Sequence, residues 1–171
     1  QATIEGFELE VTGQPTDNLS VIAIFNYTKG DYQEFDTPAY KDFQVVTIDR
    51  SDEPFGGTPE KSASLMVSYD IPAESAGLFV PRLSVVYRDD LYVGLDYLAP
   101  EYDQSWLGSY TLVNARLDWM PNDDWTITAF VDNLADENYF QGGYAVMDTL
   151  GAATVVKGPG TAYGIIISRD F

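Results

Sequence analysis

The clearest signal in the sequence is an alternation of apolar and polar residues with a period of two. Between residues 2 and 12, Phe7, Leu9 and Val11 share one face, while Glu8 and Glu10 share the other. A period of two sustained over such lengths predicts β-strands. The pattern recurs over residues 19–28, 62–71, 79–88, 110–119, from 125 onward, and in the last ten residues. About seven strands are therefore expected, and no stripe of period 3.6 indicates a helix.

The connections between these strands alternate between short and long. Residues 13–18, 72–77 and 121–124 predict tight turns, since they contain Pro, Gly or paired Asn and Asp residues. Residues 29–61, 89–109 and the segment after strand six predict long polar loops. Long loops without secondary structure are uncommon in compact domains. A transmembrane β-barrel, in contrast, has short turns at one end and long loops at the other.

Alternation alone does not separate a membrane barrel from a β-sandwich, because both have one apolar and one polar face. The last strand presents Tyr163, Ile165, Ile167 and Phe171 on one face. At about 3.3 Å per residue and a tilt near 40°, this stretch spans roughly 20 Å, close to the apolar band of about 25 Å. The strand ends also carry aromatic side chains in the pattern of two membrane girdles: Tyr69, Trp119 and Trp125 beside the short turns, and Tyr27, Tyr87 and Tyr163 near the long loops.

Composition narrows the classes of function. The net charge is −18, which argues against nucleic acid because phosphate recognition needs clustered Lys and Arg. The chain has no Cys and no His, so the usual nucleophile–base pairs and thiolate or imidazole metal sites do not arise, and we expect neither an enzyme, a cofactor nor a metal site. The acidic loop over 31–53 lacks the EF-hand pattern, and solvated charge is the favoured interpretation. A bridge through divalent cations to lipopolysaccharide is an alternative hypothesis.

The stretch from Trp125 onward, Trp-Thr-Ile-Thr-Ala-Phe-Val-Asp-Asn-Leu-Ala-Asp-Glu-Asn-Tyr, resembles the C-terminal pattern of TonB-dependent outer-membrane receptors. The family pattern corresponds to Trp125, Asn133, Leu134, Asp136 and Tyr139, followed by Gly158-Pro159-Gly160 and a terminal Phe171. Asn133 shares parity with the lipid-facing Trp125. We therefore expect it to lie above the hydrocarbon or at a bulge.

The resemblance implies an all-β fold, an antiparallel up-and-down transmembrane barrel of 22 strands, of which residues 1–171 supply the C-terminal portion of about seven. It implies ligand-gated uptake of a scarce nutrient, with a ferric siderophore or similar iron complex favoured.

The resemblance also implies partners. These are the TonB complex through an N-terminal plug, the rest of the barrel, outer-membrane lipid and lipopolysaccharide, and the barrel assembly machinery, which recognises Tyr163, Ile165, Ile167 and Phe171 as a signal. The chain begins at Gln1 without a charged or apolar leader, so we expect a fragment or processed piece with the plug and earlier strands upstream.

Candidate ligand contacts are side chains of the polar face and aromatics of the long loops. The set comprises Arg82, Arg88, Tyr102, Trp106, Asn114 and Arg116. Cationic side chains suit an anionic siderophore, and aromatic rings suit sugars or catecholates. Plain lumen lining or contact with the plug is the competing interpretation. Three alternatives remain open: carbohydrate or cobalamin uptake by the same family, a passive porin-like barrel, and a secreted β-sandwich that binds carbohydrate.

Overall fold

The computed structural model describes residues 1–41, 43–94, 106–146 and 152–170. One main sheet contains seven long strands in the order β1-β2-β5-β7-β10-β11-β14, with the short β6 beside β7. Every neighbouring pair is antiparallel. The strand bounds are β1 Ala2–Thr16, β2 Leu19–Tyr32, β5 Lys61–Tyr69, β6 Ile71–Pro72, β7 Leu78–Arg88, β10 Tyr110–Asn122, β11 Trp125–Asp132 and β14 Ala162–Arg169. The seven expected strands and their antiparallel order are confirmed.

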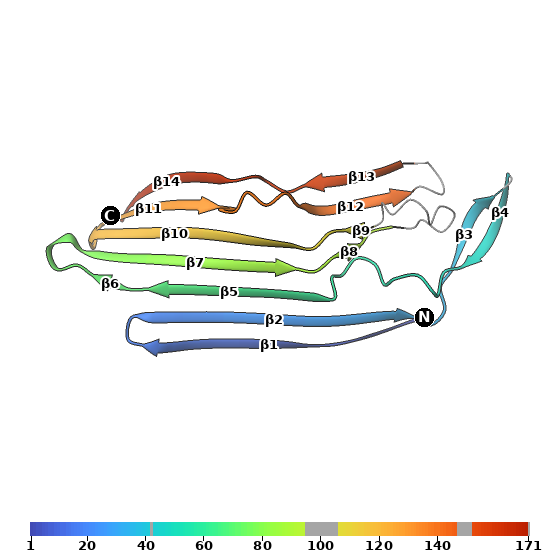
Figure 1. The fold of residues 1–171 in the computed structure, drawn as a ribbon, viewed down its shortest axis with the longest axis horizontal. Helices are drawn as coiled ribbons and strands as arrows, with labels where there is room; N and C mark the ends of the chain where they lie inside the picture. The colour runs from blue at the N-terminus through green and yellow to red at the C-terminus, as the bar shows by residue number, and fades with distance from the viewer. Residues whose placement is uncertain (42, 95–105, 147–151, 171) are drawn as a thin grey trace.

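Short and long connections separate to opposite ends of this sheet, as the alternation predicts. The turn before β2, the 3-10 helix η1 (Glu74–Ala76) and the turn before β11 lie at one end, called here the short-turn end (Figure 1). The long connections lie at the other, the hairpin end, where the N-terminus also lies. Among the described residues, no helix has the length and apolar character needed to cross a membrane.

The long connections are not irregular loops, which corrects the sequence prediction. Each carries a two-stranded hairpin of its own: β3 (Asp36–Lys41) with β4 (Gln44–Asp49), β8 (Leu91–Tyr92) with β9 (Trp106–Leu107), and β12 (Phe140–Val146) with β13 (Ala152–Lys157). The strands also run past their predicted ends. The predicted turn over residues 13–18 shrinks to Asp17 and Asn18, because β1 continues through an irregularity in register between Gly13 and Thr16. Such an irregularity accommodates Pro15, which has no N–H for a regular ladder.

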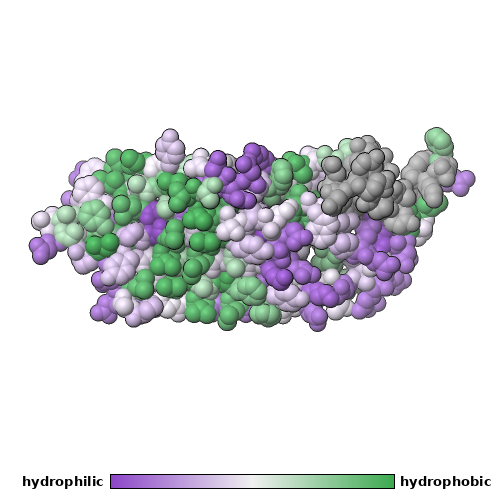
Figure 2. All heavy atoms as spheres, in the orientation of Figure 1, coloured by the Kyte–Doolittle hydropathy of each residue, from purple (hydrophilic) through white to green (hydrophobic). Residues whose placement is uncertain are grey.

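Register places a continuous set of apolar residues from all seven strands on one face, the apolar face. Phe7 pairs with Tyr27, Leu65 with Val85, and Ile127 with Ile167. The six aromatics predicted as girdles also lie on this face, three towards each end. Figure 2 shows hydrophobic side chains gathered in a band across the strands, with hydrophilic side chains prominent towards the hairpin end.

Within the part of the chain that the structure describes, no second layer of protein covers the apolar face. Leu9 is 54% exposed, Ile165 71% and Tyr163 81%. The hydrophobic side chains that are buried among the described residues are few: Ile48, Val80, Leu91, Leu107 and Tyr139. In a β-sandwich a second sheet would cover this face. An uncovered apolar face over seven strands instead fits contact with lipid.

Candidate functional site

The opposite side of the sheet, the polar face, is built around Asp118 on β10. Its carboxylate is buried and meets Arg116 Nε at 2.9 Å and Arg82 Nη1 at 3.2 Å. Thr128 Oγ1 donates a hydrogen bond of 2.5 Å to the same carboxylate. Arg82 and Arg116 are register partners on adjacent strands, so their like charges would repel without the anion between them. Asp118 therefore holds Arg82 and Arg116, two of the three predicted arginines, in place.

The other predicted polar contacts also have partners within the chain. Asn114 Nδ2 donates to Ser84 Oγ at 3.3 Å, and Arg88 Nη1 donates to the Gln141 carbonyl oxygen at 3.0 Å. The Arg88 guanidinium also lies 5.9 Å from the centre of the Tyr110 ring. These contacts agree with the lumen-lining interpretation, because they engage side-chain donors that a ligand would otherwise use.

A shallow hollow of about 430 Å³ opens on the polar face beside these residues. The lining includes Arg82, Arg116, Asn114, Met66, Phe130 and Asp132. It brings together three of the six predicted ligand contacts. Arg88 lies apart from it, near the β12–β13 hairpin, and Trp106 lies on β9 at the hairpin end. Tyr102 falls outside the described residues.

Four of the five family-pattern residues, Asn133, Leu134, Asp136 and Tyr139, form a clasp where β11 ends, whereas Trp125 begins that strand. Asn133 has a positive φ of 50°, so the chain leaves the strand there and the parity shared with Trp125 no longer applies. Its amide donates to the carbonyls of Glu137 at 2.9 Å and Pro159 at 3.2 Å, and its Oδ1 accepts from the Glu137 N–H at 2.8 Å. Thr161 Oγ1 lies 2.8 Å from the Asn133 carbonyl oxygen and 3.2 Å from Asp136 Oδ1. The clasp thus ties the start of the β12–β13 hairpin to its end.

The clasp has an aromatic side and a link to the polar face. Tyr139 is buried and its ring lies 4.5 Å from that of Tyr110. A Cβ at Gly158 would come within 2.2 Å of the Tyr139 ring, so only glycine fits there without a shift. Asn114 Oδ1 accepts from the Asn133 N–H at 2.9 Å, and the Leu134 N–H donates to the Val113 carbonyl. Asn114 therefore positions the clasp as well as lining the polar face.

The C-terminal strand carries the predicted assembly residues on the apolar face. Tyr163, Ile165 and Ile167 pair with Val131, Ala129 and Ile127 of β11. All three are exposed, whereas Phe171 falls outside the described residues. Their position on the lipid side agrees with the predicted spacing; their recognition by assembly machinery stays a prediction.

Three important contributors were missed by the sequence analysis. Asp118, Thr128 and Thr161 were not among the predicted contacts. A signal for Asp118 existed, because Arg116 and Asp118 are two residues apart on one strand and so share a face. Nothing in the local sequence indicates that Thr161 meets Asn133, since this contact spans a whole hairpin.

The geometry first defines the class of protein. An antiparallel sheet with one exposed apolar face and one hydrogen-bonded polar face is the wall of a transmembrane β-barrel. A family model described as "TonB dependent receptor-like, beta-barrel" matches residues 1–134. The chain belongs to this family of TonB-dependent receptor barrels. Barrels of this family are outer-membrane proteins, and the family and the similar solved structures are transport receptors, not enzymes.

Solved structures with the same fold include siderophore receptors. The ferric yersiniabactin uptake receptor FyuA from Yersinia pestis matches 99% of this chain with a TM-score of 0.75 and 22% identity. The siderophore receptor PiuA from Acinetobacter baumannii matches 97% with a TM-score of 0.75 and 19% identity. The ferric-catecholate import receptor Fiu from E. coli K12, in its closed form, matches 97% with a TM-score of 0.71 and 18% identity.

These matches concern only part of each receptor. The chain covers 24% of FyuA, 21% of PiuA and 20% of Fiu. No curated protein sequence matches the chain. At this level of identity, the solved structures show a shared fold and leave the cargo open.

Proposed function

We propose that residues 1–171 form the C-terminal portion of the barrel of a ligand-gated importer, which takes up a scarce nutrient across the outer membrane. The observation that carries this proposal is the bare apolar face of a seven-stranded wall, within a family of TonB-dependent receptors. A ferric siderophore or similar iron complex is the proposed cargo, because the similar structures named above are siderophore receptors.

The two edges of the sheet support the proposal that the rest of the same barrel completes this wall. Among the described strands, β1 pairs only with β2, and β14 pairs only with β11. An open edge in hydrocarbon leaves backbone N–H and C=O groups without partners, at several kcal/mol for each group. The remaining strands of the barrel would satisfy both edges.

The two faces suit the other proposed partners. The polar face, with its Asp118 network, would line the lumen and meet a plug domain through which the TonB complex acts. The apolar face would contact outer-membrane lipid, and the hairpin end would face lipopolysaccharide and the exterior. Tyr163, Ile165, Ile167 and Phe171 would serve as the signal for the barrel assembly machinery.

The test uses the full-length receptor expressed in a bacterial host that lacks its own siderophore receptors. Uptake of radiolabelled iron, supplied as a panel of ferric siderophores, is measured in hosts with and without TonB. The proposal expects uptake of at least one complex, abolished when TonB is absent. Uptake that is equal in both hosts would establish a passive pore instead.

A further inference from the structure

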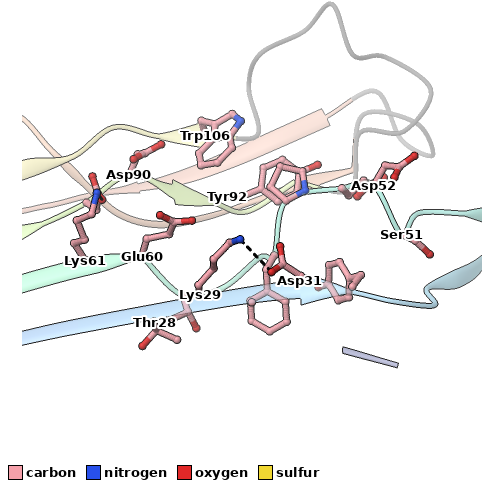
Figure 3. Close-up of a pocket in the computed structure, with 17 residues that line it drawn as sticks. Thr28, Lys29, Asp31, Ser51, Asp52, Glu60, Lys61, Asp90, Tyr92 and Trp106 are labelled. Atoms are coloured by element: carbon pink, nitrogen blue, oxygen red, sulfur yellow. Dashed lines mark ion pairs between the residues drawn. The ribbon is translucent and has the colours of Figure 1, made fainter. Parts of the chain in front are cut away.

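A second, larger hollow of about 720 Å³ lies at the hairpin end of the sheet, beside the last residues of β2 (Figure 3). It arises because β2 runs on to Tyr32 while its neighbour β5 begins only at Lys61. The Thr28 N–H donates to the Glu60 carbonyl at the point where the two strands part. The segment 51–60, Tyr92 of β8 and Trp106 of β9 supply further parts of the lining.

Contacts across the hollow fix its walls. The Gly57 N–H donates to the Tyr92 carbonyl at 3.0 Å, which joins segment 51–60 to β8. The ring of Phe55 packs on Gly30, where a Cβ would lie 2.3 Å from it. The hollow is thus a built feature of the hairpin end.

Aromatic rings in two pairs form part of the lining. Tyr32 and Phe55 have ring centres 5.1 Å apart, and those of Tyr92 and Trp106 are 5.2 Å apart. The Trp106 side chain, a predicted ligand contact, is 42% exposed. Such rings supply apolar area at fixed positions for the organic part of a ligand.

The charge of the lining is strongly negative, with six carboxylates against two lysines. Both lysines are engaged, Lys29 with Asp31 at 3.3 Å and Lys61 with Asp89 at 3.8 Å. Glu53 meets Arg50 at 3.3 Å. The other three carboxylates, on Asp52, Glu60 and Asp90, form no ion pair with any residue that the structure describes.

We propose that this hollow is a binding site for a ferric siderophore that is neutral or cationic, of the trihydroxamate type, and that it disfavours polyanionic tris-catecholates. Three monoanionic hydroxamates cancel the charge of Fe³⁺, and a pendant ammonium group makes the complex a cation. Three dianionic catecholates leave a trianion, which three unneutralised carboxylates would repel. This assignment rests on the proposed function and names the charge class of its cargo.

The decisive measurement is the affinity of the purified full-length receptor for two probes. One is a ferric linear trihydroxamate with a terminal ammonium group, and the other is a ferric tris-catecholate. The variant Asp52→Asn/Asp90→Asn removes two of the three unneutralised charges. The matched control, Asp17→Asn/Asp123→Asn, makes the same change of charge at the short-turn end, where both side chains are exposed.

We expect the trihydroxamate to bind more tightly, and the Asp52→Asn/Asp90→Asn receptor to bind it about fivefold more weakly at low salt, with the difference shrinking at high salt. The control should bind like the wild-type receptor. Equal or tighter binding of the tris-catecholate, or equal losses in both double variants, would overturn the assignment. TonB-dependent import of the tris-catecholate alone would refute the charge class and leave the proposed function standing, whereas TonB-independent import would refute the proposed function.

Discussion

Asn133, at the end of β11, combines an unusual backbone conformation with several side-chain hydrogen bonds. Its backbone has a positive φ, which Asn adopts more readily than most residues other than glycine. Its side chain at the same time satisfies backbone groups of Glu137 and Pro159. Few residue types combine this conformation with both donors and an acceptor. The place of Asn133 in the family pattern thus has a structural cause.

Replacing Asn133 by Ala should destabilise the barrel by about 2–3 kcal/mol, because three hydrogen bonds are lost and Ala is strained at positive φ. Asn133→Gly should cost about 1 kcal/mol less, since glycine removes the strain but not the loss of hydrogen bonds. The readout is the temperature at which the full-length receptor loses its folded band on a gel. Asn138→Ala, at an exposed position on the same connection, serves as the control and should change little. Equal effects at both positions would contradict the clasp.

A second prediction concerns the contribution of Asp118, on the polar face, to stability. In Asp118→Asn, Arg82 and Arg116 face each other without an intervening charge. We expect the free energy of unfolding to fall by about 1–2 kcal/mol, a figure kept small because both arginine side chains are more than 40% exposed. Asn still accepts from Thr128, which limits the loss. The same melting measurement on Asp123→Asn, an exposed acid on a turn, should show no change. A receptor with Asp118→Asn that melts like wild type would show that the network contributes little stability.

At the scale of the element, β14 shows why alternation predicts a face but not its surroundings. Ile165 and Ile166 are adjacent and chemically identical, yet Ile165 belongs to the apolar face and Ile166 lines the hollow of the polar face. Neighbouring residues on a strand point to opposite sides. In the proposed barrel, one side chain therefore meets lipid and the other meets the lumen.

A lysine should distinguish these two environments. Ile165→Lys should lower the free energy of unfolding by about 2–4 kcal/mol, because the lysine charge enters hydrocarbon near the middle of the strand. Ile166→Lys should be tolerated much better, since its ammonium group reaches a polar lumen. The amount of folded receptor in isolated outer membranes measures both. Equal losses, or a larger loss for Ile166→Lys, would contradict the assignment of faces.

The long connections mark the limit of what the sequence predicts at this scale. The wall strands were predictable because one periodic pattern fixes both strand and face. The β3–β4 hairpin was not, because its residues mix acids with aromatics and its partners are set by the local turn at Phe43, where φ is positive. The same holds for the hollow beside β2, which arises from contacts such as Phe55 on Gly30 that span 25 positions. Segments with no periodicity carry their structure in contacts that the sequence alone does not reveal.

At the scale of the whole molecule, seven strands form a wall that is incomplete by itself. Its apolar face has no protein cover, and the outer edges of β1 and β14 have no partner strand within the described residues. A lipid bilayer resolves the first problem, and closure with further strands of the barrel resolves the second. The family match and the shared fold with FyuA and PiuA point to the same arrangement.

The charged groups differ between the polar face of this wall and its hairpin end. On the polar face Arg82 and Arg116 are both paired with Asp118, whereas the hollow at the hairpin end keeps carboxylates without an ion pair among the described residues. A ligand arriving at the hairpin end would therefore meet a negative field before it reaches the lumen. Charge at the entrance, more than contacts in the lumen, would then discriminate among cargoes.

The central claim, that this chain is lipid-facing barrel wall, is tested most directly by a scan of single cysteines along β14. Residues 1–171 contain no cysteine, and any cysteine elsewhere in the full-length receptor is replaced by serine, so each introduced thiol between residues 163 and 167 reports on one position. Spin labels are attached in the full-length receptor, reconstituted into bilayers, and their access to oxygen and to a polar nickel complex is measured. The account predicts a strict period of two, with oxygen favoured at 163, 165 and 167, and the nickel complex favoured at 164 and 166. Uniform access to the nickel complex at all five positions would show a water-exposed sheet and would contradict the membrane barrel.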